Sequence, residues 1–404
     1  MRAGPARSPI VAAAVAACVP ALVAVMLAFL PATAEAACGT RTVRTPHATW
    51  AMTFDPTTCA PAHLGEDWAG EDYRAITVVG ATYVSVGQTA RDPYTSGRPE
   101  WATWTSATGS DWAGHPAPFS ASQLETGVAL RSRGSTAVLV GAGFTARSTD
   151  GATWDVGPLP PPASARVTAL VGGARWIAAG QASKSSGRAA AWTSTDGLTW
   201  SAVPDQVAFG RFCVLAAAAR PGRYVLTGSD CHDRPVTLAS PDGRTWTRSP
   251  SQAAFARLGV VRDVLATSTG FLAAGEDRSS SGARGTAFWC STDGLRWRRL
   301  AFFPAAAWTE TFVRLVRTPA GYYGLGSIGE VTEGLPPSGF YSPTGTTWSR
   351  DGKLPNPGFG SEDGDWMTDA AAIGNRIVAV GRYNDPDPGH YHAGGVLWIG
   401  DVRR

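Results

Sequence analysis

The sequence has no excess of charge of either sign and, beyond its first thirty residues, no long apolar run. It has 404 residues, with 35 Lys and Arg against 32 Asp and Glu, and a net charge of +3. This balance excludes the basic footprint of a protein that binds nucleic acid or an anionic membrane. No stretch after Pro31 is apolar and long enough to span a bilayer. We therefore expect neither nucleic acid nor membrane as a partner of the mature chain.

Sequence motifs that mark common catalytic sites are also missing. There is no His-Glu-x-x-His, no Gly-x-Ser-x-Gly, no phosphate-binding loop and no Cys-x-x-Cys. These absences argue against a zinc protease, an α/β-hydrolase, a P-loop enzyme and a dithiol redox enzyme. We expect no cofactor, apart from the divalent cation considered below.

The one long apolar segment lies near the N-terminus. Arg2 and Arg7 precede it, it runs over residues 10–30, and Ala34-Glu35-Ala36 follows it. This pattern is typical of a secretory signal peptide over residues 1–36, so we expect a secreted, extracellular protein. The alternative is a membrane-anchored protein, held by an uncleaved segment or by a lipid on Cys18.

Glycine, proline and tryptophan are abundant. Gly and Pro together make up 76 of 404 residues, about 19%, against an average near 12%. Gly and Pro at this frequency favour many short strands joined by turns over a helical fold. The 16 Trp residues require hydrophobic cores in which their side chains are buried.

A Ser-x-Asp-Gly-x-x-Trp phrase recurs along the chain. Four copies begin at Ser148, Ser194, Ser240 and Ser291, and weaker copies begin at Ser106 and Ser342. Asp-Gly between strand-like residues predicts a tight hairpin, and we expect a type I′ turn with positive φ at both central residues. Six such phrases predict six hairpins of one kind.

A second series lies upstream of these hairpins, where β-rich runs end in glycine. The seven copies end at Gly87, Gly141, Gly180, Gly228, Gly275, Gly326 and Gly381. Each unit then reads as four strands, a to d, with b ending in Gly and d opening with Trp. Units of about 40–50 residues with four strands are the signature of a β-propeller. We predict an all-β, seven-bladed propeller of antiparallel blades, formed by residues 37–404 as a single domain.

The chain ends are consistent with a closed ring. The seventh unit ends after its third strand, near Trp398, whereas residues 49–54 at the other end begin like the missing strand d. We expect this N-terminal strand to complete the last blade. Closure of this kind removes the exposed sheet edges that invite aggregation.

The hairpins resemble the Asp boxes of sialidases and of related bacterial neuraminidase repeat propellers. The resemblance covers residues 41–402 at the level of repeats, and it implies the propeller fold and a structural role for the turn residues. Here Asp and Gly are adjacent, as in Asp150-Gly151, whereas the family places one residue between them. Ser and Asp are expected to satisfy turn amides, Gly to adopt positive φ and Trp to pack between sheets.

The resemblance extends only in part to enzymatic activity. It would imply three Arg for a substrate carboxylate, an acid/base Asp and a Tyr activated by Glu. The Phe/Tyr-Arg-Ile-Pro signature of sialidases is absent, and the sequence does not place the three Arg or the Tyr and Glu. We therefore favour a non-catalytic binding or scaffold protein, and keep as the alternative an exo-sialidase-like glycoside hydrolase with a divergent site.

Antiparallel order places the b–c and d–a loops on one face, which we call the loop face, and the a–b and c–d turns on the other, the turn face. Only the loops of the loop face vary greatly in length, and function tends to lie on such loops. We expect a carbohydrate or protein ligand there, bound to a monomeric protein. The candidate ligand-binding residues are Arg91, Tyr94, Trp101, Trp308, Trp366, Tyr383 and Tyr391. The Trp residues among them either stack on a ligand or pack under a loop.

The loop of the seventh unit carries a candidate cation site. Asp385 and Asp387 alternate along the chain, as do His390 and His392, so like side chains fall on one side of an extended segment. The alternative is a solvated polar loop that its Pro residues stiffen.

Five cysteines follow the predicted cleavage site. Cys213 precedes strand a of the fourth unit and Cys231 follows its strand b, so we expect them to pair. Cys38 and Cys59 flank the closing strand and could pin it by a second disulfide. Cys290 lies beside a core Trp and is expected to be a buried free thiol.

Overall fold

The structure of the protein, a computed structural model, describes residues 40–53, 70–89, 100–119, 128–160, 166–183, 187–250, 253–255, 259–305, 309–329, 337–355, 366–384 and 393–404. All described residues belong to the unit Gly39–Arg404, which we treat by itself. They form antiparallel strands and two single-turn helices, η1 (Val207–Phe209) and η2 (Ala253–Phe255). The predicted signal peptide lies outside the described residues.

Six sheets contain four strands each, and the strands of each sheet follow one another along the chain. We number the blades in chain order. Blade 1 holds β3 (Gly70–Val79), β4 (Thr82–Thr89), β5 (Trp101–Ser106) and β6 (Ala113–Pro116); blade 2 holds β7 (Ala129–Arg133), β8 (Thr136–Gly141), β9 (Phe144–Ser148) and β10 (Asp155–Pro158). Blade 3 holds β11 (Arg166–Gly172), β12 (Trp176–Gln181), β13 (Ala189–Ser194) and β14 (Trp200–Ala202); blade 4 holds β15 (Cys213–Arg220), β16 (Arg223–Ser229), β17 (Pro235–Ser240) and β18 (Thr247–Arg248). Blade 5 holds β19 (Val260–Ala266), β20 (Phe271–Arg278), β21 (Arg284–Ser291) and β22 (Arg298–Pro304); blade 6 holds β23 (Thr309–Thr318), β24 (Gly321–Gly329), β25 (Pro337–Ser342) and β26 (Ser349–Lys353).

Blade 7 joins the two ends of the chain. Its five strands lie in the order β1-β2-β29-β28-β27, with β27 at Trp366–Ile373, β28 at Arg376–Asn384, β29 at Ala393–Val402, β2 at Ala48–Thr53 and β1 at Thr40–Arg44. β2 is the predicted closing strand, and it pairs with β29 from Ala48↔Val402 to Ala51↔Ile399. The fifth strand, β1, was not predicted, and it pairs only with β2.

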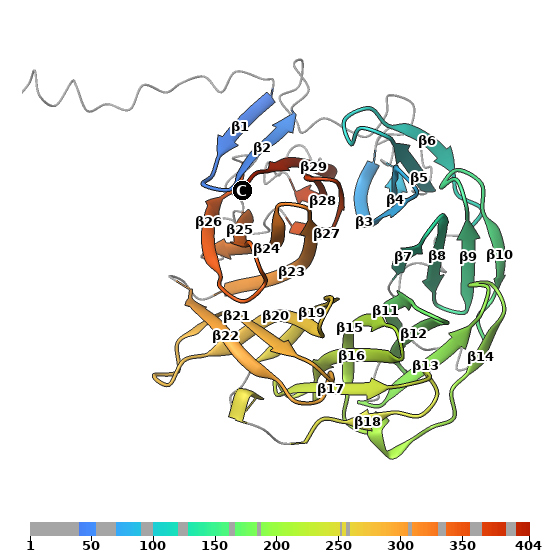
Figure 1. Cartoon of the computed structure of the whole chain (residues 1–404). Helices are drawn as coiled ribbons and strands as arrows, with labels where there is room; N and C mark the ends of the chain where they lie inside the picture. The colour runs from blue at the N-terminus through green and yellow to red at the C-terminus, as the bar shows by residue number, and fades with distance from the viewer. Residues whose placement is uncertain are drawn as a thin grey trace, which may run out of the picture. The chain divides into compact units, whose positions relative to one another are not determined.

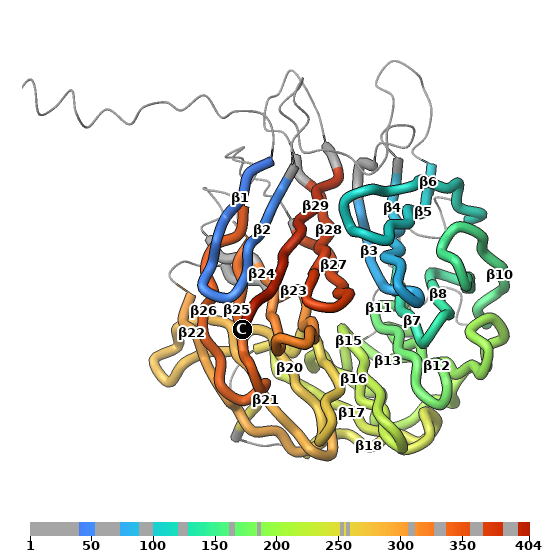
Figure 2. Tube along the Cα trace, turned by 45° about the horizontal axis from the view of Figure 1, so that its top comes forward, coloured from blue at the N-terminus to red at the C-terminus, as the bar shows by residue number. Residues whose placement is uncertain are grey.

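The first strand of each blade contacts the first strand of the next. These contacts run β3–β7–β11–β15–β19–β23–β27 and return from β27 to β3, so the seven sheets form a closed ring (Figure 1). The tube view shows the same strands standing side by side around the centre (Figure 2). The predicted seven-bladed propeller with its N-terminal closure is confirmed.

Buried aromatic residues fill the spaces between adjacent blades. Trp176, Trp192 and Trp200 share one cluster with side chains of blade 2. Trp289 and Trp297 share another with side chains of blade 4. Each cluster joins two sheets, so the blades stabilise one another in pairs around the ring.

The turns between strands c and d differ from the type I′ prediction. Six residues, 149–154, separate β9 from β10. Gly151 has a φ of 79°, but Asp150 is not among the described residues with positive φ, as type I′ would require. Instead the Asp150 carboxylate accepts hydrogen bonds from the amides of Ala152 (2.9 Å) and Thr153 (2.8 Å). The prediction of type I′ turns was wrong because a side-chain acceptor shapes a longer turn.

The same bonds recur in the other Asp-Gly turns. Ser194 Oγ accepts the amide of Gly197, and Asp196 accepts the amides of Leu198 and Thr199. These hydrogen bonds favour the charged carboxylate and hold the pKa of Asp150 and Asp196 well below the usual range. In five of the six phrases the final Trp donates its indole N–H to the Gly carbonyl of the same turn, as in Trp200 to Gly197 at 3.1 Å; the buried indole N–H of Trp246 has no such partner.

A buried hydrogen-bond network holds the N-terminal hairpin against blade 6. Asp351 on β26 is 1% exposed and accepts from Thr45 Oγ1, from the His47 amide (2.7 Å) and from Tyr323 Oη (2.6 Å). Tyr323 Oη in turn accepts the indole N–H of Trp50 (3.1 Å). Burial and the Asp351 charge raise the pKa of Tyr323, which keeps this phenol a donor. One carboxylate therefore satisfies donors of the β1–β2 connection and of β24.

We expect Asp351→Ala to lower the free energy of unfolding by about 3 kcal/mol, because three buried donors lose their acceptor. Urea unfolding followed by tryptophan fluorescence measures this change. Lys353→Ala on the same strand removes an exposed side chain and should change stability by less than about 0.5 kcal/mol. Equal effects of the two substitutions would contradict the role assigned to Asp351.

Candidate functional site

Six of the seven glycines of the strand b series, all except Gly141, lie opposite a β-bulge in the described part of strand a. In β11 the register shifts between Val167 and Ala169, and Val167 pairs with Gly180. A Cβ on Gly180 would collide with the backbone of Arg166 and Val167, so the crowded side of the bulge requires glycine. The same shift occurs in β3, β15, β19, β23 and β27.

The residue inserted at each bulge lines a central cavity. A bulge re-aims the side chain that it inserts, and here the inserted residues are Arg74, Thr168, Leu215, Arg262, Val313 and Thr368. All six line a cavity of about 150 Å³ to which every blade contributes, blade 2 through Val128, Ala129 and Arg131. They lie in the first half of their strands, toward the loop face. The repeated bulges thus place one side chain from each of six blades around the central cavity.

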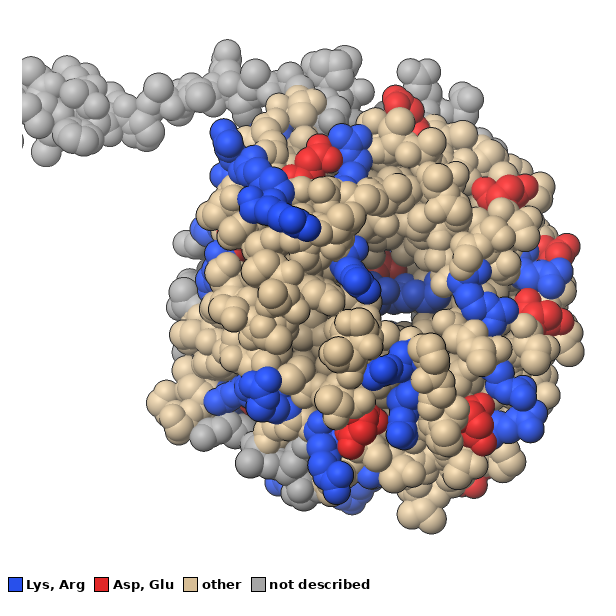
Figure 3. Space-filling view, in the orientation of Figure 1, with Lys and Arg blue, Asp and Glu red and all other residues tan. Residues whose placement is uncertain are grey.

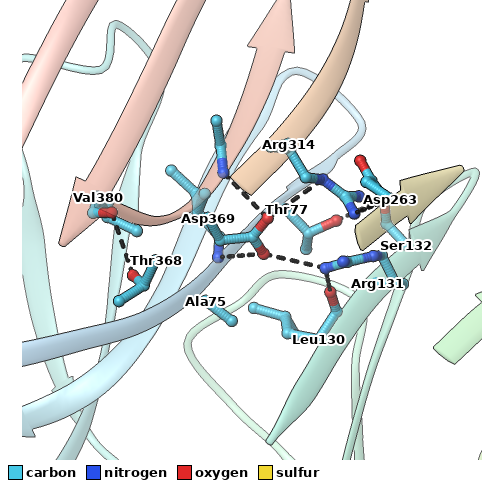
Figure 4. A network of polar contacts seen from close by, with 12 residues as sticks. Ala75, Thr77, Leu130, Arg131, Ser132, Asp263, Arg314, Thr368, Asp369 and Val380 are labelled. Atoms are coloured by element: carbon cyan, nitrogen blue, oxygen red, sulfur yellow. Dashed lines mark hydrogen bonds and ion pairs between the residues drawn. The ribbon is translucent and has the colours of Figure 1, made fainter. Parts of the chain in front are cut away.

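Four charged residues of this channel form one network (Figure 4). Arg314 Nη1 lies 3.0 Å from Asp263 Oδ1, and Arg314 Nε lies 3.2 Å from Asp369 Oδ1. Arg131 Nη1 lies 3.0 Å from Asp369 Oδ2. The network therefore ties blades 2, 5, 6 and 7 together across the channel.

The network carboxylates also accept backbone amides of the following blade. Asp263 Oδ2 accepts the amide of Leu315 (2.7 Å), and Asp369 Oδ2 accepts the amide of Ile76 (3.3 Å). Both carboxylates are almost fully buried, with side chains 3% and 6% exposed. Such amides sit at corresponding positions of strand a, so the carboxylates act as bridges between adjacent blades.

A separate ion pair lies within blade 5. Arg262 Nε and Nη2 donate to Glu276 with distances of 2.9 Å for the bonds to Oε1 and Oε2 respectively. Glu276 Oε1 also lies within hydrogen-bonding distance of the Phe312 amide (3.4 Å). Arg262 is 37% exposed, so its guanidinium stays in contact with solvent. The two parallel hydrogen bonds to Glu276, and not close packing, fix the orientation of the Arg262 guanidinium.

Burial shifts the pKa values of the network in opposite directions. It raises the pKa of Asp263 despite the nearby Arg314 charge. It lowers the pKa of Arg131, which also feels the positive charge of Arg314. Burial also lowers the pKa of Arg314, but the negative charges of Asp263 and Asp369 have the larger combined effect. The pKa of Arg314 is therefore raised. Of the two network arginines, Arg314 is thus the more firmly charged.

Four guanidinium groups and three carboxylates lie at the loop-face side of the channel among the residues that the structure describes. Arg74, Arg131, Arg262 and Arg314 oppose Asp263, Asp369 and Glu276. Guanidinium groups bind carboxylate, phosphate and sulfate oxygens in pairs. At about 150 Å³ the cavity is smaller than the 300 Å³ or more typical of small-molecule sites, so it could hold an anionic group but not a whole sugar. No cluster of three His, Cys, Asp or Glu among the described residues could hold a metal ion.

Among the predicted ligand-binding residues, the structure fully describes Trp101. It lies in β5, is 4% exposed and packs in a cluster with Val86, Phe119 and Leu130. Trp101 is therefore a core residue, which is the second of its two interpretations. Trp366 begins β27, and Tyr383 is the residue before the last of β28, so both lie at the loop-face end of blade 7.

The other predicted site residues lie outside the described residues. They are Arg91, Tyr94, Trp308 and Tyr391 for the ligand, Asp385, Asp387, His390 and His392 for the cation, and Cys38 and Cys59 for the second disulfide. Their roles remain predictions.

Cys213 and Cys231 form a disulfide, as expected, with Cα atoms 5.2 Å apart. It closes the b–c loop of blade 4 on to the start of β15. Within this loop Asp230 Oδ1 accepts the amides of His232 (2.9 Å) and Arg234 (3.0 Å). Cys290 is a free thiol, as predicted, but it is only half-buried, because its side chain lines a cleft on the turn face.

The charged channel residues were missed by sequence reasoning, although a signal exists. The cavity-lining residue lies thirteen positions before the strand b glycine in six blades, as in 87 − 74 = 13, and twelve before it in blade 3. A charged residue beside one of these positions, in a strand a that is otherwise apolar, therefore indicates a channel residue. The prediction placed function on the loops alone and did not use this spacing.

No family model matches the chain, and no curated protein matches it either. Solved structures do resemble it. A protein of unknown function from Dyadobacter fermentans is 14% identical with a TM-score of 0.47, over 90% of this chain and all of that one. Trypanosoma rangeli sialidase in complex with sialic acid is 12% identical with a TM-score of 0.42, over 90% of this chain and 59% of that one.

Phage phi92 endosialidase is also 12% identical, with a TM-score of 0.45 over 83% of this chain and 68% of that one. This chain therefore spans about three fifths of the length of the trypanosomal sialidase. At such identities the likeness concerns the fold and says nothing of activity. Among the described residues, no helix has the length and apolar character needed to cross a membrane.

We expect Arg314→Met to lower the free energy of unfolding by about 3–5 kcal/mol, because it leaves Asp263 buried without a counter-charge. Adding Asp263→Asn should restore at least half of the loss, since the neutral amide still accepts the Leu315 amide. Urea unfolding of the two single variants and the double variant measures this coupling. Arg147→Met, which removes the exposed Arg147–Asp155 pair, should cost less than about 1 kcal/mol. Additive effects of Arg314→Met and Asp263→Asn would contradict the network.

Proposed function

We propose that the protein is a non-catalytic binding protein whose ligand, a carbohydrate or a protein segment with an acidic group, binds over the channel on the loop face. The observation that supports this proposal is the gathering of four guanidinium groups at the channel, of which Arg262 is held by Glu276 with its side chain in contact with solvent. The acidic group enters the channel, and the remainder of the ligand lies on the surrounding loops.

Arg262 is well placed to reach a ligand. It is 37% exposed, whereas Arg314 and Arg131 are 19% and 26% exposed and bind network carboxylates. Glu276 holds the Arg262 guanidinium in a fixed orientation without withdrawing it from solvent. A preoriented guanidinium loses little side-chain freedom on binding, which favours affinity.

The bonding of the channel carboxylates favours binding over hydrolysis. A glycosidase needs one carboxyl that gives or takes a proton beside a second that acts as nucleophile or base, and a sialidase-like site needs a Tyr beside a Glu. Asp263, Asp369 and Glu276 are each held by an Arg and a backbone amide. No Tyr is among the described residues that line the channel. The glycoside hydrolase remains the alternative proposal.

The setting of the proposed function is extracellular. The Cys213–Cys231 disulfide is compatible with an oxidising compartment, as is the predicted signal peptide. We propose a secreted monomer with no nucleic-acid partner. A divalent cation at the loop of blade 7 belongs to the same proposal.

We expect Arg262→Gln to weaken the binding of acidic glycans at least tenfold on a glycan array followed by calorimetry. Arg299→Gln is a matched control, because Arg299 is also 37% exposed and pairs with a carboxylate of blade 5, Asp277, outside the channel. Its binding should be unchanged. Turnover of an aryl sialoside or of an aryl glycoside panel would favour the hydrolase instead.

Joint substitution of Asp385, Asp387, His390 and His392 by Ala should weaken cation or ligand binding and leave the unfolding midpoint unchanged. Calorimetric titration with Ca²⁺ and Zn²⁺ tests the cation, and the glycan assay tests the ligand. Unaltered binding in both assays would remove the loop of blade 7 from the proposed site.

A further inference from the structure

Five of the six c–d turns close on the preceding blade in the same way. A Cβ on the turn glycine would overlap a strand b side chain of that blade, as Gly151 would overlap Val84. The same holds for Gly109 with Val378, Gly197 with Val138, Gly243 with Ile177 and Gly294 with Val225. Close contact at the turn glycine is therefore the rule of this propeller.

Blade 6 departs from this rule. The atoms nearest to a Cβ on Gly345 belong to the ring of Tyr322, at 3.2 Å, which is in the same blade. The corresponding strand b residue of blade 5 is Leu272, and it lines an open cleft together with Gly345 and Tyr322. The cleft measures about 500 Å³, within the range of small-molecule sites. We call it the blade 5–6 cleft.

The chemistry of the blade 5–6 cleft is cationic and rich in hydroxyl groups. Arg296 and Arg298 line it together with Ser and Thr residues of three turns and with Tyr322, and apolar residues such as Phe271, Leu272 and Trp297 complete the lining. No Asp or Glu is among the described residues that line it. A smaller cleft of about 270 Å³ between blades 2 and 3 instead includes Asp155 and Asp196. The two clefts thus differ in charge as well as in size.

Further arginines flank the inner end of the blade 5–6 cleft. Arg220 Nη2 lies 3.5 Å from the carbonyl of Ser268, a residue of the cleft wall. The exposed Arg317 pairs across the sheet with Tyr322. Figure 3 looks on to this face, and it shows basic side chains gathered around the central hollow. Arg296 and Arg298 are thus the arginines that line the cleft, and Arg220 contacts its wall at Ser268.

One carboxylate, that of Asp293, lies beside Arg296 at the edge of the cleft. Asp293 Oδ2 lies 3.9 Å from Arg296 Nη1. Its other oxygen, Oδ1, accepts the amides of Leu295 and Arg296, both at 2.8 Å, so Asp293 is committed to its own turn. Arg296 is 84% exposed on its side chain and can turn toward a ligand.

We propose that the blade 5–6 cleft binds an acidic saccharide, with a carboxylate or sulfate between the arginines and the sugar hydroxyls on the Ser and Thr side chains. Guanidinium forks match both oxyanions. The half-buried ring of Tyr322 offers an aromatic edge to a sugar. This site lies on the face opposite the proposed channel ligand, and it does not depend on that proposal.

The experiment is calorimetric titration of the full chain with three probes of equal length: an oligogalacturonide, a sulfated disaccharide and neutral cellobiose. We expect the acidic probes to bind at least tenfold more tightly than cellobiose, and the stronger of them identifies the anion. Arg296→Ala/Arg298→Ala should reduce that affinity at least tenfold. Arg244→Ala, an exposed arginine of the blade 4 turn outside the cleft, should not change it.

A second measurement uses the wild-type chain and so does not depend on how the variants fold. Cys290 lines the cleft and is free, so a bound saccharide should slow its alkylation at least fivefold. Arg262→Gln should leave this protection intact, which separates the cleft from the channel. Equal binding of neutral and acidic probes, an equal loss in Arg244→Ala, unprotected Cys290, or binding of inorganic sulfate alone would each overturn the proposal.

Discussion

The contact between a β-bulge in strand a and a glycine in strand b is the constraint on which the rest of this structure depends. The bulge brings the strand a backbone so close that a side chain at Gly180 would collide with it. Its inserted residue turns toward the centre of the ring, where seven blades meet at one cavity. Because the bulge is repeated, substitutions at the inserted residue and at the residue after it set most of the charge of the channel.

The ring is closed by two polar systems of different character. The channel network crosses between blades that are distant in sequence, from Arg131 to Asp369 and Arg314. Asp351 instead fixes the N-terminal hairpin, and through it the closing strand, to blade 6. Buried ion pairs contribute little net stability against apolar packing, but they penalise wrong pairings strongly. The Arg314–Asp263 and Arg314–Asp369 pairs link adjacent blades, and the Arg131–Asp369 pair links blades 2 and 7 across blade 1.

The repeat made the fold predictable from the sequence, whereas the site was predictable only in part. Gly and Trp at regular spacing identified the blades, and the position of Cys213 and Cys231 on adjacent strands identified their disulfide. The turn type was missed because the Asp150 carboxylate accepts two turn amides. The preference of the Asp-Gly dipeptide for type I′ turns does not take such side-chain bonds into account. The Asp263–Arg314–Asp369 network was missed because its members are about fifty residues apart along the chain. Only closure of the ring brings them together.

Function in a repeat protein should lie where the repeat is broken, because positions that repeat are explained by packing. The Asp-Gly turns repeat, and their Asp carboxylates accept hydrogen bonds from amides of the same turn. Arg314 does not repeat, since the residue after the bulge in other blades is Ala or Asp, as in Ala216 and Asp263. Arg262 shares its place in the bulge with Arg74, whereas the other described bulges insert Thr, Leu or Val. Gly345 keeps the glycine but loses the contact that explains it elsewhere. The channel and the blade 5–6 cleft are therefore places where the described chain departs from what the fold requires, on opposite faces and both lined by arginines.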